Sequence, residues 1–69
     1  MNSDTNQIST AQIRSLANEV FGDPVKVANW FASPVDALGR QTPESLLGDE
    51  QGRKDVHAVL VRIGDGVFS

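Results

Sequence analysis

The chain opens with a polar stretch, residues 1–7, that shows no hydrophobic periodicity, and residues 1–8 are predicted to be a flexible lead-in. Apolar residues then recur at i, i+3, i+4, i+7 and i+8, the pattern of one helix face: Ile13, Leu16, Ala17, Val20 and Phe21. Ser9 followed three residues later by Gln12 is a capping box, and Gly22 is a typical C-terminal stop. The pattern predicts a first helix over residues 10–21.

A second helix is predicted over residues 24–32. It begins at Pro24 with Asp23 as its capping residue, and proline is favoured in the first turn because its missing N–H would have no partner there. Its apolar positions are Val27, Trp30 and Phe31. Because the residue before a proline prefers extended conformations, Ser33 and Pro34 are expected to end this helix, and a one-turn linker follows.

A short helix and then a longer one are predicted in the rest of the chain. The short helix opens at Thr42-Pro43, where a capping residue again precedes proline, and it must bury Leu46-Leu47. Asp49 caps the longer helix, whose apolar stripe again has helical spacing: Val56, Val59, Leu60 and Ile63. Gly64 or Gly66 is expected to end it.

Short helices joined by glycine or proline connectors are typical of compact antiparallel or crossed packing rather than of a coiled coil. No strand-like alternation of useful length and no internal repeat is present. The fold class predicted from the pattern is therefore all-α, a small single-domain bundle of four to five short helices. The folded domain is expected to cover residues 9–69.

Composition adds that this bundle is only marginally stable. The chain has 69 residues and no cysteine, so neither a disulfide nor a Cys-ligated zinc can support its core. A domain of this size buries only about 60% of the surface that its unfolded chain exposes. A partner chain is therefore the expected source of additional stability.

Charge and hydropathy exclude several classes of partner. Six Lys and Arg against nine Asp and Glu give a net charge of −3, with no basic face that could displace counterions from phosphates. We therefore expect no direct nucleic-acid partner. The chain also shows no membrane span, secretion signal or transit peptide, and the cytoplasm is the expected compartment.

The inventory of chemically active side chains is small. There is one histidine, and cysteine and tyrosine are absent, so no catalytic set can be assembled. His57 lies beside the apolar stripe of the last helix, either as a polar contact or proton carrier at an interface or as a solvent-exposed flank. Neither Asp49 nor Asp55 shares a helix face with it, so no metal site is expected, and no cofactor is indicated.

Three apolar residues are candidates for contact with another protein. Val61 lies off the stripe of the last helix, which makes that helix apolar on more than one side. Phe68 next to the chain end either folds back onto the core or is an anchor for a partner. Trp30 belongs either to the core or to such a surface.

Gly64-Asp65-Gly66 follows a helix rather than a strand, so we interpret it as a helix stop and flexible exit, not a phosphate-binding loop.

An ordered set of short motifs covers residues 11–68. In chain order they are Leu16-Ala17, Val20-Phe21-Gly22-Asp23, Val27-Ala28-Asn29-Trp30-Phe31, Ser33-Pro34, Ala37-Leu38-Gly39, Thr42-Pro43-Glu44-Ser45-Leu46-Leu47, Gly52, Val56, Leu60, Arg62-Ile63 and Gly66-Val67. This set resembles the toxin-binding domain of antitoxins of the Xre/MbcA/ParS family. No single motif is diagnostic, but their order is fairly specific.

The resemblance implies a small all-helical domain that neutralises a toxin of the RES family, whose members consume or transfer from NAD. In such pairs the last helix and C-terminal tail of the antitoxin cover the active-site cleft of the toxin. Carried onto this chain, the resemblance points to Arg62, Asp65, Gly66, Val67 and Phe68, beside which Val61 lies. The implied mechanism is steric exclusion of the nucleotide, so the enzyme of the pair is the partner.

The chain departs from the family pattern in two places. Many members carry an N-terminal helix-turn-helix domain that represses the operon, for which residues 1–8 leave no room, so autoregulation by this chain alone is not expected. Where the family commonly has a second glycine after Leu-Gly, this chain has Arg40, which either alters the loop or supplies a partner contact.

Other functions compete with that of an antitoxin. One is a structural or regulatory module that homodimerises through Trp30, Val61 and Phe68, or an adaptor that forms a heterodimer with a related antitoxin. Another is a helix-turn-helix DNA binder that uses the helices over 10–21 and 24–32, which the net charge of −3 disfavours.

Overall fold

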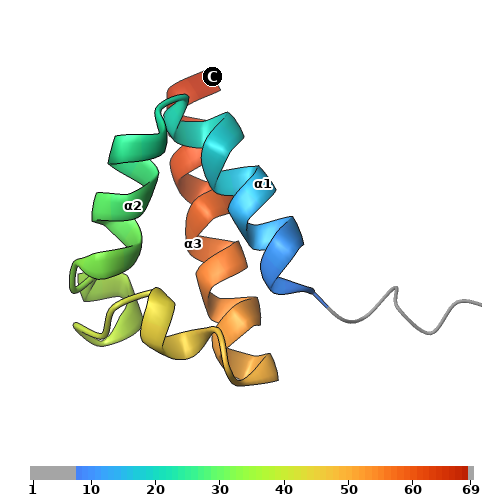
Figure 1. Cartoon of the computed structure of the whole chain (residues 1–69), viewed down its shortest axis with the longest axis vertical. Helices are drawn as coiled ribbons and strands as arrows, with labels where there is room; N and C mark the ends of the chain where they lie inside the picture. Colours follow the sequence, from blue (N-terminus) through green and yellow to red (C-terminus); the bar gives the residue numbers. More distant parts are fainter. Residues whose placement is uncertain (1–7, 69) are drawn as a thin grey trace, which may run out of the picture.

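A computed structural model describes residues 8–68, which form three α-helices and two single-turn 3-10 helices (Figure 1). The α-helices are α1 (Thr10–Phe21), α2 (Pro24–Ala32) and α3 (Glu50–Phe68), and the 3-10 helices are η2 (Asp36–Leu38) and η3 (Glu44–Leu46). Within the described residues there is no strand, and one isolated antiparallel bridge joins Val35 and Gln41. The all-α prediction is confirmed.

The part of the chain that the structure describes contains three α-helices, slightly fewer than the four to five helices predicted. The segment after Thr42 forms only η3, in which the N–H of Leu47 donates to the carbonyl of Glu44 at 3.2 Å, an i to i+3 bond. Asp49, which caps α3, follows two residues later, so no residues are available for a second turn. Leu47 is buried as expected, whereas Leu46 is only half-buried.

The predicted helix starts are confirmed by their capping bonds. In α1 the N–H of Gln12 donates to Ser9 Oγ at 3.1 Å, and the N–H of Ser9 donates to Gln12 Oε1 at 2.8 Å. The carboxylate of Asp23 accepts from an N–H in the first turn of α2 at 2.9 Å. The carboxylate of Asp49 accepts from the N–H of Gly52 at 3.2 Å, as a capping residue of α3 does.

The predicted end of the last helix is wrong. α3 continues through Gly64 and Gly66 to Phe68, so the expected helix stop and flexible exit at Gly64-Asp65-Gly66 is part of the helix. Among the described residues, glycines with positive φ occur only at Gly22 and Gly39, so neither glycine of α3 adopts the left-handed cap. A helical glycine costs only about 0.5–1 kcal/mol relative to alanine, which tertiary packing can offset.

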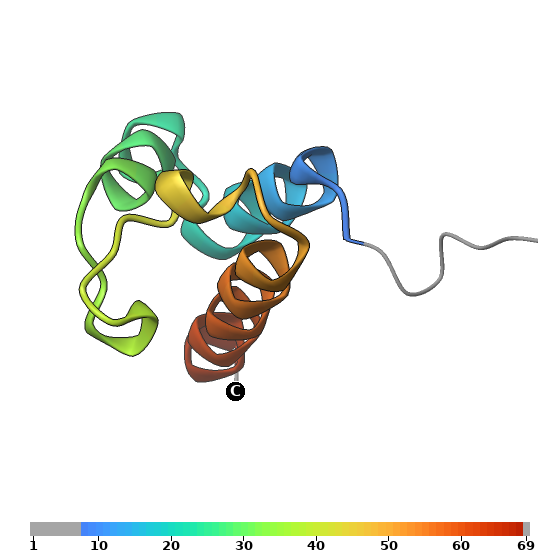
Figure 2. The ribbon, with the colours of Figure 1, turned by 90° about the horizontal axis from the view of Figure 1, so that it is seen from below.

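The core lies where α1 meets α2 and α3. Its buried apolar residues are Ile13, Ala17, Val20, Val27, Phe31, Leu38, Leu47, Val56 and Leu60. Seen from below, α1 and α2 occupy one side of the molecule, and α3 occupies the other side together with η2 (Figure 2). Because α1 covers only one face of α3, the opposite face of this helix is left open to solvent.

The first turn of α3 is bonded to the start of the described chain and to the nearby η3 segment. The guanidinium of Arg53 donates through Nε to the carbonyl of Ile8 at 2.9 Å and through Nη1 to the carbonyl of Leu47 at 2.8 Å. One residue earlier, Gly52 is buried, and a Cβ atom placed there would overlap the carbonyl oxygen of Leu46 and lie 2.9 Å from its Cβ. The position of α3 therefore depends on the absence of a side chain at Gly52.

The turn after η2 contains two consecutive left-handed residues. Gly39 has a φ of 68° and Arg40 a φ of 65°, and Arg40 is the one non-glycine residue with positive φ among those described. The N–H of Arg40 donates to the carbonyl of Val35 at 2.9 Å, which closes the turn. Arg40 thus adopts a conformation that glycine takes without strain.

Replacing Gly52 with alanine is expected to lower the free energy of unfolding by about 1–3 kcal/mol, because the added methyl group meets the backbone of Leu46. Urea denaturation measures the change. The matched control is Gly66→Ala, also in α3, where nothing lies within 4 Å of the added Cβ and stability should be unchanged or higher. Equal stability of Gly52→Ala and the original chain would contradict the close contact.

Replacing Arg40 with glycine is expected to raise the free energy of unfolding by about 0.5–1 kcal/mol, because the left-handed conformation is strained only for a residue with a Cβ. Thermal denaturation should show a melting temperature higher by a few degrees. Arg40→Ala, which removes the charge but keeps the Cβ, serves as the control and should give no increase.

Candidate partner-binding surface

The face of α3 turned away from the core forms a continuous exposed strip. Its members follow helical spacing and are all exposed: Lys54, Asp55, Ala58, Val61, Arg62, Asp65 and Gly66. We call this set the outer strip of α3. Val61 has 40% of its surface exposed. Among the described residues, one other large apolar side chain is exposed, that of Val25 on α2, at 65%.

Charges of both signs flank Val61 on the outer strip. Lys54 forms an ion pair with Glu50, with 3.8 Å between Nζ and Oε2, and Asp55 accepts a hydrogen bond of 3.0 Å from Gln51. Within residues 8–68, neither Arg62 nor Asp65 forms a salt bridge. An exposed apolar side chain beside unpaired charges of both signs can bind a protein surface through apolar burial and ion pairing together.

The structure brings most of the sequence-predicted contact residues into one surface. Val61, Arg62, Asp65 and Gly66 all belong to the outer strip. Val67 and Phe68 continue the same helix, but their side chains lie outside the described part of the structure. Whether Phe68 packs onto the core or anchors a partner therefore stays a prediction.

Trp30 and His57 do not belong to the outer strip. Trp30 is half-buried against the core, with its ring centroid 5.7 Å from that of Phe21 and 5.2 Å from that of Phe31. His57 is half-buried at the flank of α3. A role for either residue in an interface stays a prediction.

Arg40 lies apart from α3 in the sequence but close to it in the fold. It follows η2, which packs against α3, and Figure 2 shows the η2 turn on the same side of the molecule as α3. Its side chain is 85% exposed and forms an ion pair with Asp36, with 3.6 Å between Nε and Oδ1. The turn therefore lies next to α3.

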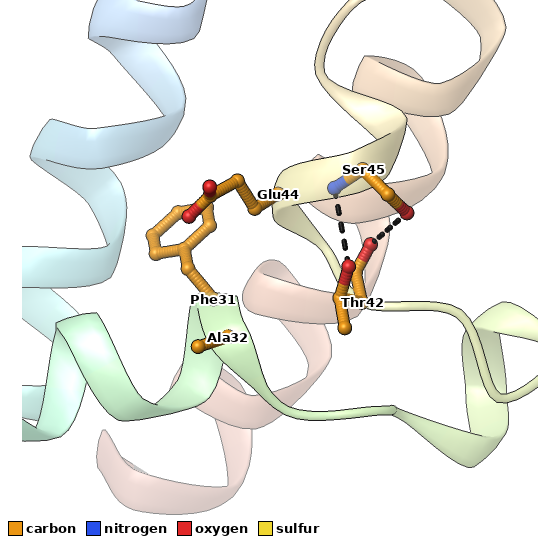
Figure 3. Close-up of a pocket in the computed structure, with 5 residues that line it drawn as sticks. All are labelled: Phe31, Ala32, Thr42, Glu44 and Ser45. Atoms are coloured by element: carbon orange, nitrogen blue, oxygen red, sulfur yellow. Dashed lines mark hydrogen bonds between the residues drawn. The ribbon is translucent and has the colours of Figure 1, made fainter.

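A pocket of about 360 Å³ at the end of α2 was not anticipated from the sequence (Figure 3). It is lined by Phe31, Ala32, Thr42, Glu44 and Ser45. Ser45 uses its hydroxyl to donate to the carbonyl of Thr42 at 2.7 Å, and its N–H donates to Thr42 Oγ1 at 3.3 Å. These polar groups stabilise the turn itself, and no periodicity in the sequence indicates that the end of α2 meets residues 42–45.

Residues 8–68 contain no group of three or more histidine, aspartate or glutamate side chains placed to hold a metal ion. In the same part of the chain, no helix combines the length and the apolar character needed to cross a membrane.

Three curated relatives resemble the chain, and each is named antitoxin Xre. The protein from Photorhabdus laumondii is 44% identical over 48 residues, which cover 70% of this chain and 32% of the relative. The protein from Yersinia enterocolitica is 36% identical over 84% of this chain and 40% of the relative. The protein from Pseudomonas putida is 32% identical over 83% of this chain and 36% of the relative.

The chain thus spans between about a third and two fifths of the length of these relatives. No solved structure matches it. The family model described as antitoxin Xre/MbcA/ParS C-terminal toxin-binding domain matches residues 16–66, a segment that reaches from α1 to the end of the outer strip. The resemblance noted in the sequence is therefore confirmed, and the chain belongs to the family of Xre/MbcA/ParS antitoxin C-terminal toxin-binding domains.

Proposed function

We propose that this chain neutralises a RES-family toxin by laying the outer strip of α3 and the C-terminal tail over the active-site cleft of the toxin. The observation that carries the proposal is the exposed strip itself, in which Val61 lies between charged residues on a helix that packs on one side only. Family membership supports a toxin as the partner.

The dimensions of the outer strip suit insertion into a cleft. From Lys54 to Gly66 the strip runs along three helical turns, about 18 Å at 1.5 Å per residue. Binding of a helix in a groove uses apolar anchors at helical spacing, and charges at the edge of the interface set its orientation. Val61 is the described apolar anchor in this arrangement, and Arg62 and Asp65 are the flanking charges.

The mechanism we propose is steric exclusion. The bound helix occupies the space that NAD needs, so inhibition requires burial and complementary charge but no catalytic group from this chain. The toxin is the enzyme of the pair, and the two proteins meet in the cytoplasm, where the toxin has access to NAD. The small core of the free chain is stabilised further by binding, because a partner that binds only the folded state shifts the folding equilibrium.

A second candidate function uses the same exposed valine. A module without a toxin partner can bury Val61 against a second copy of the chain or against a related antitoxin. The two functions differ in their readouts, since one predicts toxin neutralisation and the other predicts a dimer.

Val61→Asp is expected to weaken toxin binding at least about tenfold, because it places a charge at the centre of the buried interface. The affinity for a purified RES-family toxin is measured by titration calorimetry. Val25→Asp is the matched control, since it adds the same charge at an even more exposed valine on a different helix and should leave binding unchanged. Equal affinity of both variants for the toxin would show that the outer strip is not part of the interface.

A chain that ends at Gly64 is expected to stay folded but to lose toxin neutralisation. Among the residues whose burial the structure describes, every buried apolar residue of the core precedes this position, so the melting temperature should change by only a few degrees. Growth of cells that co-express the toxin reports neutralisation, and size-exclusion chromatography with light scattering reports oligomeric state. Loss of a dimer with no toxin involvement would favour the second candidate function.

A further inference from the structure

Arg40 occupies a strained backbone conformation without an evident benefit to the fold. Its φ of 65° lies in the left-handed region that side chains with a Cβ rarely adopt. Its polar partner, Asp36, lies 3.6 Å away, but the two side chains are 85% and 95% exposed. An ion pair this exposed is screened by water and contributes little to stability. The cation therefore contributes little to the stability of the turn.

The turn that carries Arg40 is nevertheless held firmly in place. Leu38, the last residue of η2, is buried in the core, and the bridge between Val35 and Gln41 closes the turn behind it. A long charged side chain on a fixed turn costs less entropy to immobilise at an interface than one on a mobile loop. Strained residues in a well-supported backbone are found where a function maintains them.

The 36–40 turn lies next to α3 in the fold. η2 packs against α3, and Figure 2 shows both on the side of the molecule opposite α1 and α2. A protein that covers the outer strip of α3 and extends toward η2 reaches the 36–40 turn as well.

We propose that Arg40 is a specificity-determining residue of this interface and that its guanidinium binds a carboxylate on the protein that covers the outer strip. The inference rests on the proposed function, because the toxin is the occupant of that strip. A guanidinium pairs with a carboxylate through two parallel hydrogen bonds, a geometry that lysine cannot reproduce. Because Asp36 is exposed and singly bonded, it can be displaced when the carboxylate of the partner arrives.

The test compares Arg40→Gly, Arg40→Lys and Arg40→Glu in titrations against a purified RES-family toxin, at low and at high salt. We expect Arg40→Gly to raise the melting temperature and yet weaken binding about tenfold. A residue with only a structural role cannot produce that combination. Arg40→Lys should bind more tightly than Arg40→Gly but less tightly than the original chain. Arg40→Glu should weaken binding about a hundredfold, and high salt should reduce most of that difference in affinity.

Lys26→Glu is the matched control for Arg40→Glu, because it makes the same change in net charge at an exposed position on α2. It should bind like the original chain. If Arg40→Glu binds as well as Lys26→Glu while Val61→Asp does not bind, the role of Arg40 is refuted and the proposed function stands. If the original chain does not bind the toxin, both are refuted, and a dimer that depends on Arg40 would show that the carboxylate belongs to a second copy.

Discussion

The close packing of Gly52 against Leu46 is the constraint on which the rest of this structure depends. The start of α3 can approach the η3 turn this closely only because no Cβ lies between the helix and the Leu46 carbonyl. The next residue, Arg53, then reaches two further carbonyls, one of them 45 positions earlier in the chain. A single helical turn thus joins the beginning, the middle and the last helix of the domain, in a chain that has no cysteine.

This fixed start determines the direction of the whole of α3. A helix held at its first turn and packed along one face by α1 must leave its other face exposed, and the outer strip is that face. The surface around Val61 is therefore a consequence of how α3 is anchored more than ten ångströms away, since Gly52 and Val61 are nine residues apart and a helix rises 1.5 Å per residue, about 13 Å in all.

Glycine and arginine have opposite roles at two turns of the domain. At position 52 glycine is required because space is absent, whereas at position 40 glycine would be better for the fold and arginine is present instead. Stability and interaction are therefore separable in this small protein: its core residues are buried and apolar, and the residues proposed for recognition are exposed, with charged side chains around Val61. Such a division lets an interface vary between partners without loss of the fold.

The sequence by itself determined the helix starts, the apolar faces and the family, because capping, proline preference and hydrophobic spacing act over a few residues: Ser9, Asp23 and Asp49 cap as their neighbours indicate. It also indicated Val61, Arg62 and Asp65 as contact residues, but their common exposed face on α3 came from the structure, because the sequence predicted a helix stop at Gly64-Asp65-Gly66. It did not locate the end of α3, since the helix passes through Gly64 and Gly66 when packing outweighs their weak local preference. The left-handed conformation of Arg40 is local, but no sequence pattern revealed it. The contact of η2 with α3 and the bond from Arg53 to Ile8 were decided only by the tertiary structure, because each joins separate segments of the chain.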